Sequence, residues 1–473
     1  MIDIGYELIR SWADRTGNVN STSDILRWID ERNKTLKVSV EPVEFSYDGF
    51  WFYDEESGFI RNRNNSFFQL AGFKALADGQ VVCEQPVIIQ DEIGFLGIIC
   101  RMIDGELNLL MQAKIEPGNT NVVQISPTIQ ATKSNFTRRH GGKEPKYLDY
   151  FLHAEENEIL VDQVQSEQSS RFFKKRNRNI VVLVSGDVPL YDSHKWMTLG
   201  QIKEFMKIDN LVNMDTRTVI SCLLACWCGS DAEASSGSRM DEIRGMVGDD
   251  AFYESMFRQP DRTVMQRAFK MLNDRKMFCD RESILVPLKS LDKWVMSADS
   301  ISCKEPFPFR VIYCKIEIED REVKCWDQPL VQALGKSLFG VFSCVDEGVR
   351  KYLVRVKEEI GCFDHAEFGP AVQLEPLYSS GSYELDAVET LFLFKLAEGG
   401  GVMVNVVQSE EGGRFYHEEN VNVVIDIDKA LLDELPDGYI WMDHATISEM
   451  IQFSNVVNIQ LRNIMSLLDI GGE

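Results

Sequence analysis

MQAKIEPGNTNVVQISPTIQATKSNFTRR, residues 111–139, is the segment around which the chain is organised. Glu116–Asn121 is expected to be a turn, because proline presets φ and glycine and asparagine tolerate left-handed backbone. After the turn, apolar residues at positions 123, 125 and 129 alternate with amides and hydroxyls. This period of two predicts a strand over 124–132 with one apolar and one polar face.

The polar face of this predicted strand carries no charge. It consists of Gln124, Ser126, Thr128, Gln130 and Thr132. Solvated strand faces usually carry Lys, Glu and Asp, whereas a neutral hydrogen-bonding face suits an uncharged polar ligand such as a sugar. A Thr- and Gln-rich face of an exposed sheet is the alternative, and the pattern alone does not separate the two.

Bulk properties limit the partners and the compartment. The length of 473 residues predicts two or three domains, and the net charge of −24 argues against nucleic acid and anionic membranes as partners. The sequence has no apolar stretch of about 20 residues, so we expect no membrane span. The N-terminus lacks a signal-peptide pattern. The scattered cysteines favour a reducing, cytoplasmic compartment. Cys222, Cys226 and Cys228 lack the second cluster that a zinc site needs, so we predict no metal.

The expected elements divide the chain into alternating blocks. Helices are expected over 1–35, where Ser21 or Ser23 is the cap, and over 195–228 and 240–275. Short strands are expected between residues 36 and 184 and again from residue 283. The small polar segment 229–237 is the best linker in the chain.

The second half of the chain repeats the first at a constant spacing of 243 residues. Gln85-Pro86 recurs as Gln328-Pro329, and Gln165-Ser166-Glu167 recurs as Gln408-Ser409-Glu410. The matches indicate a duplicated unit of about 230 residues, far longer than a solenoid repeat. We therefore predict an α+β fold of two tandem domains, 1–229 and 230–473, each a mixed sheet with flanking helices.

The two copies differ in charge. After its polar strand, the first copy has Lys133, Arg138, Arg139 and His140, where the second copy has no basic residue. The first copy also contains RFFKKRNRN (171–179), the most basic segment of this acidic chain. Clustered Arg and Lys hold diphosphates through charge-assisted hydrogen bonds, and a solvated hairpin is the alternative. We expect the anion-binding site in the first copy.

Several residues are candidates for catalysis or base stacking. Glu116, Glu167 and His140 are candidate general bases, and a plain structural role is the alternative for each. Trp51 is a candidate for stacking on a nucleotide base, but its counterpart Trp294 makes core packing the competing interpretation. The sequence contains no nucleotide-binding glycine fingerprint, phosphate loop, HExxH motif or nucleophile elbow.

Four long segments resemble the NDP-hexose 2,3-dehydratases of deoxysugar biosynthesis. They are residues 94–138, VDQVQSEQSSRFFKKRNRN (161–179), NLVNMDTRTVISCL (210–223) and QSEEGGRFYHEENVN (408–422). The resemblance implies two tandem Nudix-like α+β domains within a homodimer. It also implies a nucleotide-sugar pocket in each domain, one of them catalytic.

The resemblance further implies a substrate and a reaction. The substrate is an NDP-4-keto-6-deoxyglucose, commonly the dTDP form, and loss of the C2 hydroxyl as water gives an NDP-3,4-diketo-2,6-dideoxyhexose. A base removes the C3 proton, donors hold the enolate and an acid assists the leaving hydroxyl, so no redox cofactor or metal is needed. A non-catalytic nucleotide-sugar binding protein and a nucleotide-sugar hydrolase are the alternatives, and the missing Nudix acidic motif argues against the hydrolase.

From charge and spacing we assign roles in the first copy. Glu116 or His140 is base or acid, with Lys114 and Gln130 near the keto sugar and Glu167 as a further catalytic candidate. The diphosphate is assigned to Arg138, Arg171, Lys174 and Arg176. The remaining predicted substrate contacts are Trp51, Asn119, Asn121, Gln124, Ser126, Thr128, Thr132, Gln165 and Asn177.

Overall fold

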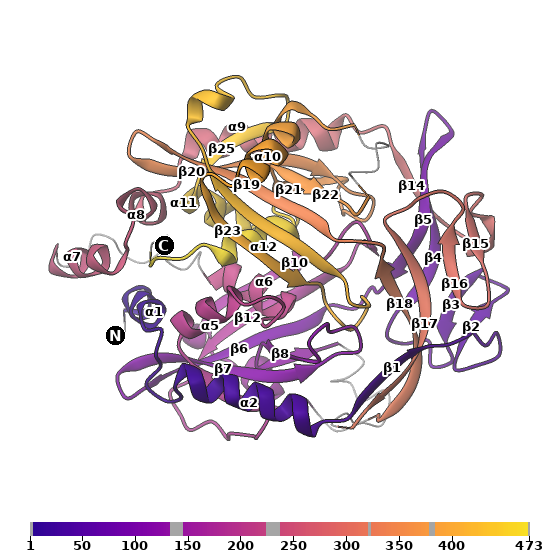
Figure 1. The fold of residues 1–473 in the computed structure, drawn as a ribbon, viewed down its shortest axis with the longest axis horizontal. Coiled ribbons are helices and arrows are strands. Elements are labelled where there is room, and N and C mark those ends of the chain that lie inside the picture. Colours follow the sequence, from indigo (N-terminus) through magenta and orange to yellow (C-terminus); the bar gives the residue numbers. More distant parts are fainter. Residues whose placement is uncertain (1–2, 133–144, 224–236, 320–322, 378–383, 472–473) are drawn as a thin grey trace.

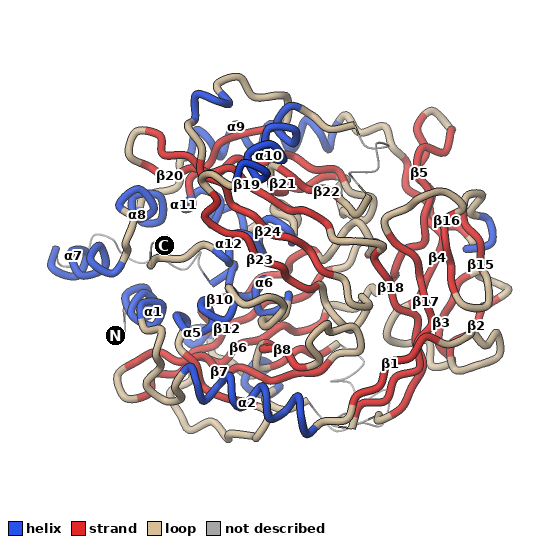
Figure 2. Tube along the Cα trace, viewed as in Figure 1, coloured by secondary structure: helices blue, strands red, loops and turns tan. Residues whose placement is uncertain are grey.

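The computed structural model describes residues 3–132, 145–223, 237–319, 323–377 and 384–471. In this part of the chain the strands form four sheets (Figures 1 and 2). Figure 1 shows two central sheets one above the other, with helices α6 and α12 between them and the outer sheets at one side. The predicted α+β class is confirmed.

The first central sheet belongs to the first half of the chain. Its strand order is β10-β12-β6-β7-β13, with β8 beside β7 and β9 beside β6. β12 runs parallel to β6 and the other pairs are antiparallel. The strands are β6 (Gly94–Ile103), β7 (Glu106–Ile115), β8 (Val123–Ser126), β9 (Ile129–Ala131), β10 (Ile159–Ser166), β12 (Arg176–Leu183) and β13 (His194–Met197). Its helices are α4 (Leu148–Leu152), α5 (Leu199–Met206) and α6 (Met214–Leu223).

The second central sheet repeats this topology strand for strand. Its order is β21-β20-β19-β24-β23, with β22 beside β19 and β25 beside β20. The one parallel pair again joins the equivalent strands, β19 and β24. The strands are β19 (Ser337–Asp346), β20 (Val349–Glu358), β21 (Ala366–Pro370), β22 (Val372–Leu374), β23 (Val402–Ser409), β24 (Glu419–Asp426) and β25 (Tyr439–Asp443), and the helices are α10 (Ala387–Glu398), α11 (His444–Ile451) and α12 (Ile459–Leu467).

Backbone details also recur between the halves. Asn210 and Asn455 are both left-handed, at φ 57° and 60°, and so are Lys174 and His417, at 53° and 48°. Non-glycine residues adopt this conformation infrequently. Matching left-handed positions therefore support the duplication independently of residue identity.

The two outer sheets exchange strands between the halves. One contains β2 (Trp51–Asp54), β3 (Phe59–Asn62), β4 (Gln69–Ala77), β5 (Gln80–Ile89) and β11 (Phe172–Phe173), and it receives β14 (Glu282–Val286) from the second half. The other contains β15 (Trp294–Met296), β16 (Ser300–Cys303), β17 (Phe309–Ile318) and β18 (Cys325–Ala333), and it receives β1 (Val38–Pro42) from the first half. Separating the halves would therefore break two strand ladders, β1 with β17 and β14 with β4.

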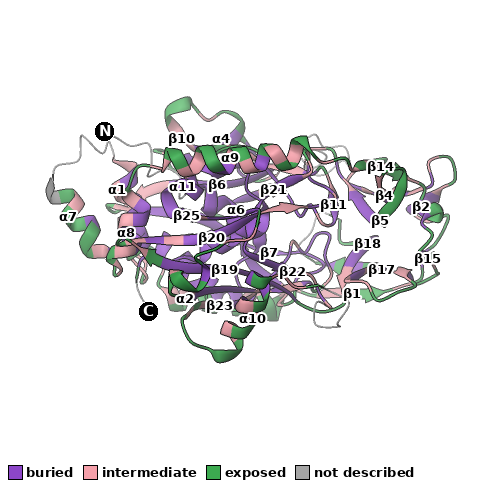
Figure 3. Ribbon diagram, turned by 90° about the horizontal axis from the view of Figure 1, so that it is seen from above, coloured by how far each residue is buried: buried purple, intermediate pink, exposed green. Residues whose placement is uncertain are grey.

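The remaining helices flank the central layers. They are α1 (Ile4–Ala13), α2 (Thr22–Thr35), α7 (Gly237–Met246), α8 (Asp250–Phe257) and α9 (Arg262–Met277). Of the two serines predicted as the cap of α2, Ser21 and Ser23, the cap is Ser21, whose side chain accepts a hydrogen bond from the Asp24 backbone N–H. Figure 3 shows that α6 and the central strands are largely buried, whereas α2 and α9 have exposed outer faces. No helix in the described ranges is long and apolar enough to cross a membrane.

The predicted strand over 124–132 is interrupted. Pro127 and Thr128 separate β8, which pairs with β7, from β9, which pairs with β6. Proline has no backbone N–H to offer to a ladder. The Thr128 hydroxyl accepts from the Ile99 N–H (2.9 Å) and donates to the Leu110 carbonyl, so it bridges β6 and β7 where they diverge. Period-two alternation therefore does not extend across the whole segment.

Candidate functional site

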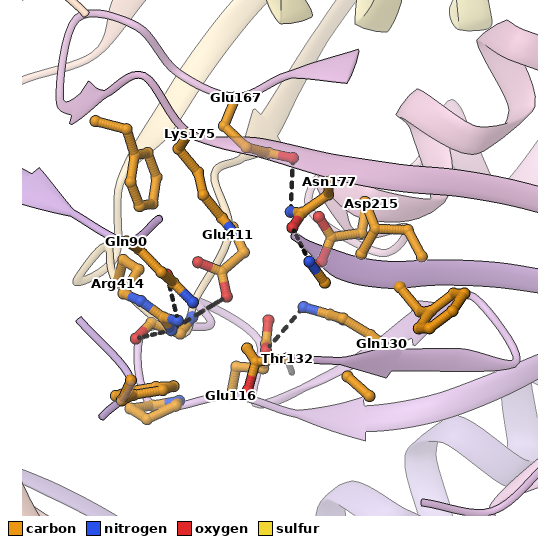
Figure 4. Close-up of a pocket in the computed structure, with 18 of the residues that line it drawn as sticks. Gln90, Glu116, Gln130, Thr132, Glu167, Lys175, Asn177, Asp215, Glu411 and Arg414 are labelled. Carbon is orange, nitrogen blue, oxygen red and sulfur yellow. Dashed lines mark hydrogen bonds and ion pairs between the residues drawn. The ribbon is translucent and has the colours of Figure 1, made fainter. Parts of the chain in front are cut away.

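A cavity of about 160 Å³ lies where the ends of β7, β9 and β10 meet the start of β12 and the first turn of α6 (Figure 4). Residues from both halves of the chain line it. Its charged side chains are Lys114, Glu116, Glu167, Lys175, Asp215, Glu411 and Arg414. Four carboxyl groups and three cationic groups therefore share one small space.

Glu116 follows β7 and begins the turn that the sequence predicted. The Asn119 N–H donates to the Glu116 carbonyl (3.1 Å), and Asn119 Nδ2 donates to the Val122 carbonyl (2.8 Å). The left-handed residue at the end of this turn is Val122, at φ 64°. Gly118 is required for a steric reason and not for a left-handed conformation. A Cβ at this position would lie 1.5 Å from the Phe415 carbonyl oxygen.

The Glu116 carboxylate is held by two donors, one from β7 and one from β9. Lys114 Nζ lies 3.1 Å from Glu116 Oε1, and Gln130 Nε2 donates to the same oxygen over 3.1 Å. Gln130 is itself oriented by Asn213, whose Nδ2 donates to Gln130 Oε1 (3.3 Å). The two donors therefore fix the orientation of the Glu116 carboxyl group at the cavity.

Glu167 and Lys175 lie at the opposite side of the cavity. Asn177 Nδ2 donates to Glu167 Oε1 (2.8 Å), and the Asn177 side-chain oxygen accepts from the Gly94 N–H (3.1 Å). Burial raises the pKa of the Glu167 carboxyl. Burial also lowers the pKa of Lys175, to about 8, and its ammonium donates to the Glu92 carbonyl.

Asp215 enters the cavity from the first turn of α6. It is 1% exposed, and its Oδ2 atom accepts no hydrogen bond within the described part of the chain. Burial, followed by the charges of Glu411, Glu167 and Glu116, raises the pKa of Asp215 well above its usual range. Burial and the surrounding carboxylates therefore favour the protonated form of Asp215 more strongly than in an exposed aspartate.

Glu411 and Arg414 come from the second half, on the loop between β23 and β24. The Gly118 N–H donates to the Gly412 carbonyl (2.7 Å), and the His417 N–H donates to the Gly118 carbonyl (2.9 Å). These bonds join the second-half loop to the turn after Glu116. Arg414 Nη2 donates to Gln90 Oε1 (2.9 Å), and Arg414 Nη1 lies 3.8 Å from Glu411 Oε1. Burial and the charge of Glu116 raise the pKa of Glu411 to about 7.

Part of this arrangement recurs at the equivalent positions of the second half. There, Asn458 donates a hydrogen bond to the side-chain oxygen of Gln373, and Gln373 donates one to Glu359, as the equivalent first-half residues do. The titratable groups differ, however, because Lys175, Asp215 and Glu411 correspond to Glu418, Gln460 and Gln168. The shared bonds therefore recur in both halves, whereas the titratable groups around them differ in type and position.

Six predicted site residues line the cavity: Lys114, Glu116, Gln130, Thr132, Glu167 and Asn177. Three others from the polar segment lie outside its lining. Gln124 Nε2 donates to the Asn210 carbonyl (2.8 Å) and to Ser409 Oγ (2.6 Å), Thr128 bridges β6 and β7, and Ser126 is buried in β8. Contact of these three with substrate stays a prediction.

Other predicted residues are also placed away from the cavity lining. Gln165 donates to the Ile451 carbonyl, and Asn119 and Asn121 belong to the turn after β7. The Trp51 ring is buried and lies 4.7 Å from the Phe68 ring, measured between centroids. Trp51 thus has the surroundings that the core-packing interpretation expected.

The predicted diphosphate residues are dispersed. Arg171 is buried beside Glu375, with Nη2 2.6 Å from Glu375 Oε2, at the position in the second half that Arg414 occupies in the first. Lys174 is exposed above the Phe173 ring, and Arg176 lies 4.1 Å from the centre of the Phe363 ring. The two other predicted residues, Arg138 and His140, lie outside the described residues.

Sequence reasoning missed Lys175, Asp215, Glu411 and Arg414 as site residues. Lys175 belongs to the basic segment that was singled out, and Asp215 belongs to the segment NMDTRT. For Glu411 the available signal was a difference within the repeat, since the acid replaces Gln168 of the first copy. Within the described ranges, no group of three or more His, Cys, Asp or Glu side chains is arranged to hold a metal ion.

Comparisons with known proteins match both halves of the duplicated chain. The family profile described as NDP-hexose 2,3-dehydratase matches residues 22–223 and 265–468, once in each half. A dTDP-4-dehydro-6-deoxy-alpha-D-glucopyranose 2,3-dehydratase of Amycolatopsis orientalis is 31% identical over 99% of this chain and 94% of its own length. Enzymes of the same name from Saccharopolyspora spinosa and Streptomyces violaceoruber are each 32% identical, over 94% and 95% of this chain and 91% and 97% of their own lengths. The chain therefore belongs to the NDP-hexose 2,3-dehydratase family of nucleotide-sugar hydro-lyases.

Proposed function

We propose that the chain converts an NDP-4-keto-6-deoxyglucose, in its dTDP form, into the NDP-3,4-diketo-2,6-dideoxyhexose. The substrate follows from the names of the relatives. The observation that carries the proposal is one cavity that holds carboxyl groups in different surroundings. Glu116 is paired with Lys114, whereas the pKa values of Asp215 and Glu411 are raised. Elimination next to a ketone requires both a base and an acid.

The cavity has the size of the reacting part of such a substrate. An engineered cavity of about 150 Å³ in another protein holds benzene, a six-membered ring, and this cavity measures about 160 Å³. The sugar ring therefore occupies the cavity, and the diphosphate and the base extend beyond it. Arg138, Lys174 and Arg176 remain the proposed diphosphate contacts.

Glu116 is the base that removes the C3 proton. The C3 proton is acidic because it is α to the C4 ketone, and its electron pair moves to the C4 oxygen as the enolate forms. The pairing of Glu116 with Lys114 and Gln130 supports an ionised carboxylate ready to accept that proton. Glu167, held by Asn177, is the competing base, and single Glu→Gln variants at the two positions separate these assignments.

Asp215 stabilises the enolate as a neutral acid. A carboxyl group that remains protonated at neutral pH donates a hydrogen bond to a developing oxyanion, which stabilises the charge as it forms. The buried Oδ2 atom and the raised pKa of Asp215 support this role at the C4 oxygen. Lys175 adds a second donor within the same cavity.

The elimination then proceeds without a change of oxidation state in the protein. The enolate electrons restore the C4 carbonyl and form the C2–C3 double bond while the C2 hydroxyl leaves with one added proton as water. The product carries a hydroxyl on C3 as an enol. Loss of that hydroxyl proton and protonation of C2 give the 3,4-diketone.

Purified protein incubated with dTDP-4-keto-6-deoxyglucose in deuterated water tests this function. We expect mass spectrometry to show loss of one water and deuterium incorporated at C2 of the product, with and without a metal chelator. A nucleoside monophosphate would indicate a hydrolase instead. An unchanged sugar nucleotide in the dTDP, GDP and UDP series would indicate a binding protein.

We also propose that each half is a Nudix-like unit and that the chain forms a homodimer. The repeated central sheet with β8 and β9 wedged between β6 and β7 supports the first point. Light scattering after size-exclusion chromatography tests the second. A mass of one chain would refute the homodimer without affecting the proposed reaction.

A further inference from the structure

We propose that Glu411, a residue of the second half of the chain, is the general acid that protonates the C2 hydroxyl as it leaves the sugar. This inference rests on the proposed function and assigns a catalytic group to it. It implies that the first-half site is chemically incomplete without the second half.

Backbone contacts place Glu411 firmly at the cavity. Its loop is hydrogen-bonded to the turn after Glu116 through Gly118 and Gly412. The Gly413 N–H donates to Glu411 Oε1 (3.1 Å), which fixes the carboxyl group relative to that loop. Figure 4 shows the Glu411 carboxyl between Lys175, Arg414 and Glu116, pointing into the space that these side chains enclose.

The proposed base and the proposed acid approach the cavity from different halves of the molecule. Glu116 is carried by the end of β7, and Glu411 by the loop between β23 and β24. Removal of a proton from C3 and protonation of an oxygen on C2 need two groups beside adjacent carbons. Two side chains from separate, mutually bonded loops meet this requirement.

The charges around Glu411 are suited to proton donation near neutral pH. Glu116 and Glu167 raise its pKa, Arg414 and Lys114 lower it, and burial is the largest effect. Asp215 and Lys175 also line the same cavity. The resulting pKa of about 7 is close to the working pH, where acid catalysis is most efficient.

The duplication allows the residue at the Glu411 position to be compared between the two halves. The residue equivalent to Glu411 is Gln168, whose Nε2 donates to Glu410 at the corresponding place in the second half. A glutamine amide has hydrogen atoms to donate in hydrogen bonds but no acidic proton to transfer. Only the first-half cavity therefore has a transferable proton at this position.

The step is balanced as an acid–base exchange. The C2–O bond breaks, its electron pair stays with oxygen, and the Glu411 proton joins the departing group to form water. The enolate supplies the electron pair of the new C2–C3 bond. At this point Glu116 carries the C3 proton and Glu411 is a carboxylate. Glu116 gives its proton to C2 or to solvent during the tautomerisation, and Glu411 takes a proton from the C3 hydroxyl of the enol or from solvent.

The decisive experiment compares Glu411→Gln with wild type on two substrates. One is the 4-keto sugar nucleotide, and the other is its 2-deoxy-2-fluoro analogue, whose leaving fluoride needs little proton assistance. We expect Glu411→Gln to lose about 100-fold in dehydration, consistent with a lost general acid. Fluoride release and exchange of the C3 proton with deuterated water are expected to remain within about 5-fold of wild type.

Glu410→Gln is the matched control, because it makes the same substitution at the next residue. Glu410 is also buried, and it lies outside the cavity lining and hydrogen-bonds to Asn420 and Gln168. We expect its dehydration rate to stay near that of wild type, and thermal unfolding of both variants confirms that they are folded.

Three results are distinguishable. Wild type that fails to dehydrate the substrate refutes the proposed function itself. Active wild type together with a Glu411→Gln variant that loses fluoride release and C3 exchange as well shows that Glu411 only supports the site, which overturns the acid role. A folded Glu411→Gln variant that dehydrates at the wild-type rate overturns it also.

Discussion

Replacing Gly118 by alanine is expected to separate the two loops that close the cavity. The added Cβ would lie 1.5 Å from the Phe415 carbonyl oxygen, and ordinary contact begins at 3.4 Å. The loops must therefore move apart by about 2 Å, because the obstructing atom belongs to the backbone and cannot rotate away. The hydrogen bonds from Gly118 to Gly412 and from His417 to Gly118 would be stretched or lost.

The magnitude follows from these contacts. Two backbone hydrogen bonds contribute about 1 kcal/mol each, and overpacking costs about 1–3 kcal/mol, so the free energy of unfolding should fall by about 3–5 kcal/mol. Movement of Glu411 by an ångström or more out of proton-transfer reach should lower turnover by about 100-fold.

Denaturant unfolding and the rate of water loss from the 4-keto substrate measure the two effects. Gly186→Ala is the matched control, since a Cβ there meets no atom within 4 Å, and we expect it to match wild type in both assays. A Gly118→Ala variant with wild-type stability and turnover would refute the inferred contact between the loops.

Three further predictions address individual side chains. Glu116→Gln should lose both C3 proton exchange and dehydration by about 1000-fold, and retained exchange would transfer the base role to Glu167. Trp51→Ala should lower the free energy of unfolding by about 3–5 kcal/mol while the folded fraction keeps its KM, whereas a raised KM at wild-type stability would favour base stacking. Burial raises the pKa of Glu418 to about 8, above its value in the unfolded chain, so ionisation of Glu418 destabilises the fold as pH rises from about 5 to 8. Glu418→Gln should therefore raise the free energy of unfolding at pH 8 and leave it unchanged at pH 5, and equal effects at both pH values would contradict this.

Local patterns in the sequence predicted much of the secondary structure. The Ser21 cap of α2 and most strands of the first central sheet follow from capping chemistry and short-range periodicity. The exception is the segment 124–132, where the missing N–H of Pro127 outweighs the alternation and splits the strand. The alternation of apolar and polar residues does not predict which neighbouring strand each residue pairs with.

The site was predicted in part for the same reason. Lys114, Glu116, Gln130 and Thr132 lie within one segment, so a local polar pattern was sufficient to select them. Arg171 and Arg414 occupy equivalent positions in the two copies, yet only Arg414 lines the first-half cavity. Each arginine side chain contacts a residue of the opposite half, Arg171 with Glu375 and Arg414 with Gln90. Residue type and sequence spacing do not predict these contacts between the halves.

The sequence by itself determined the duplication, the α+β class and the family. These depend on residue identities and on periodicities that extend over a few residues. Only the tertiary structure decided that β1 and β14 are exchanged and that Glu411 joins Glu116 in one cavity. Such contacts join residues hundreds of positions apart, through the strand ladders between the halves and the hydrogen bonds between the loops that carry Gly118 and Gly412. Local periodicity and residue type carry no information about contacts at that separation.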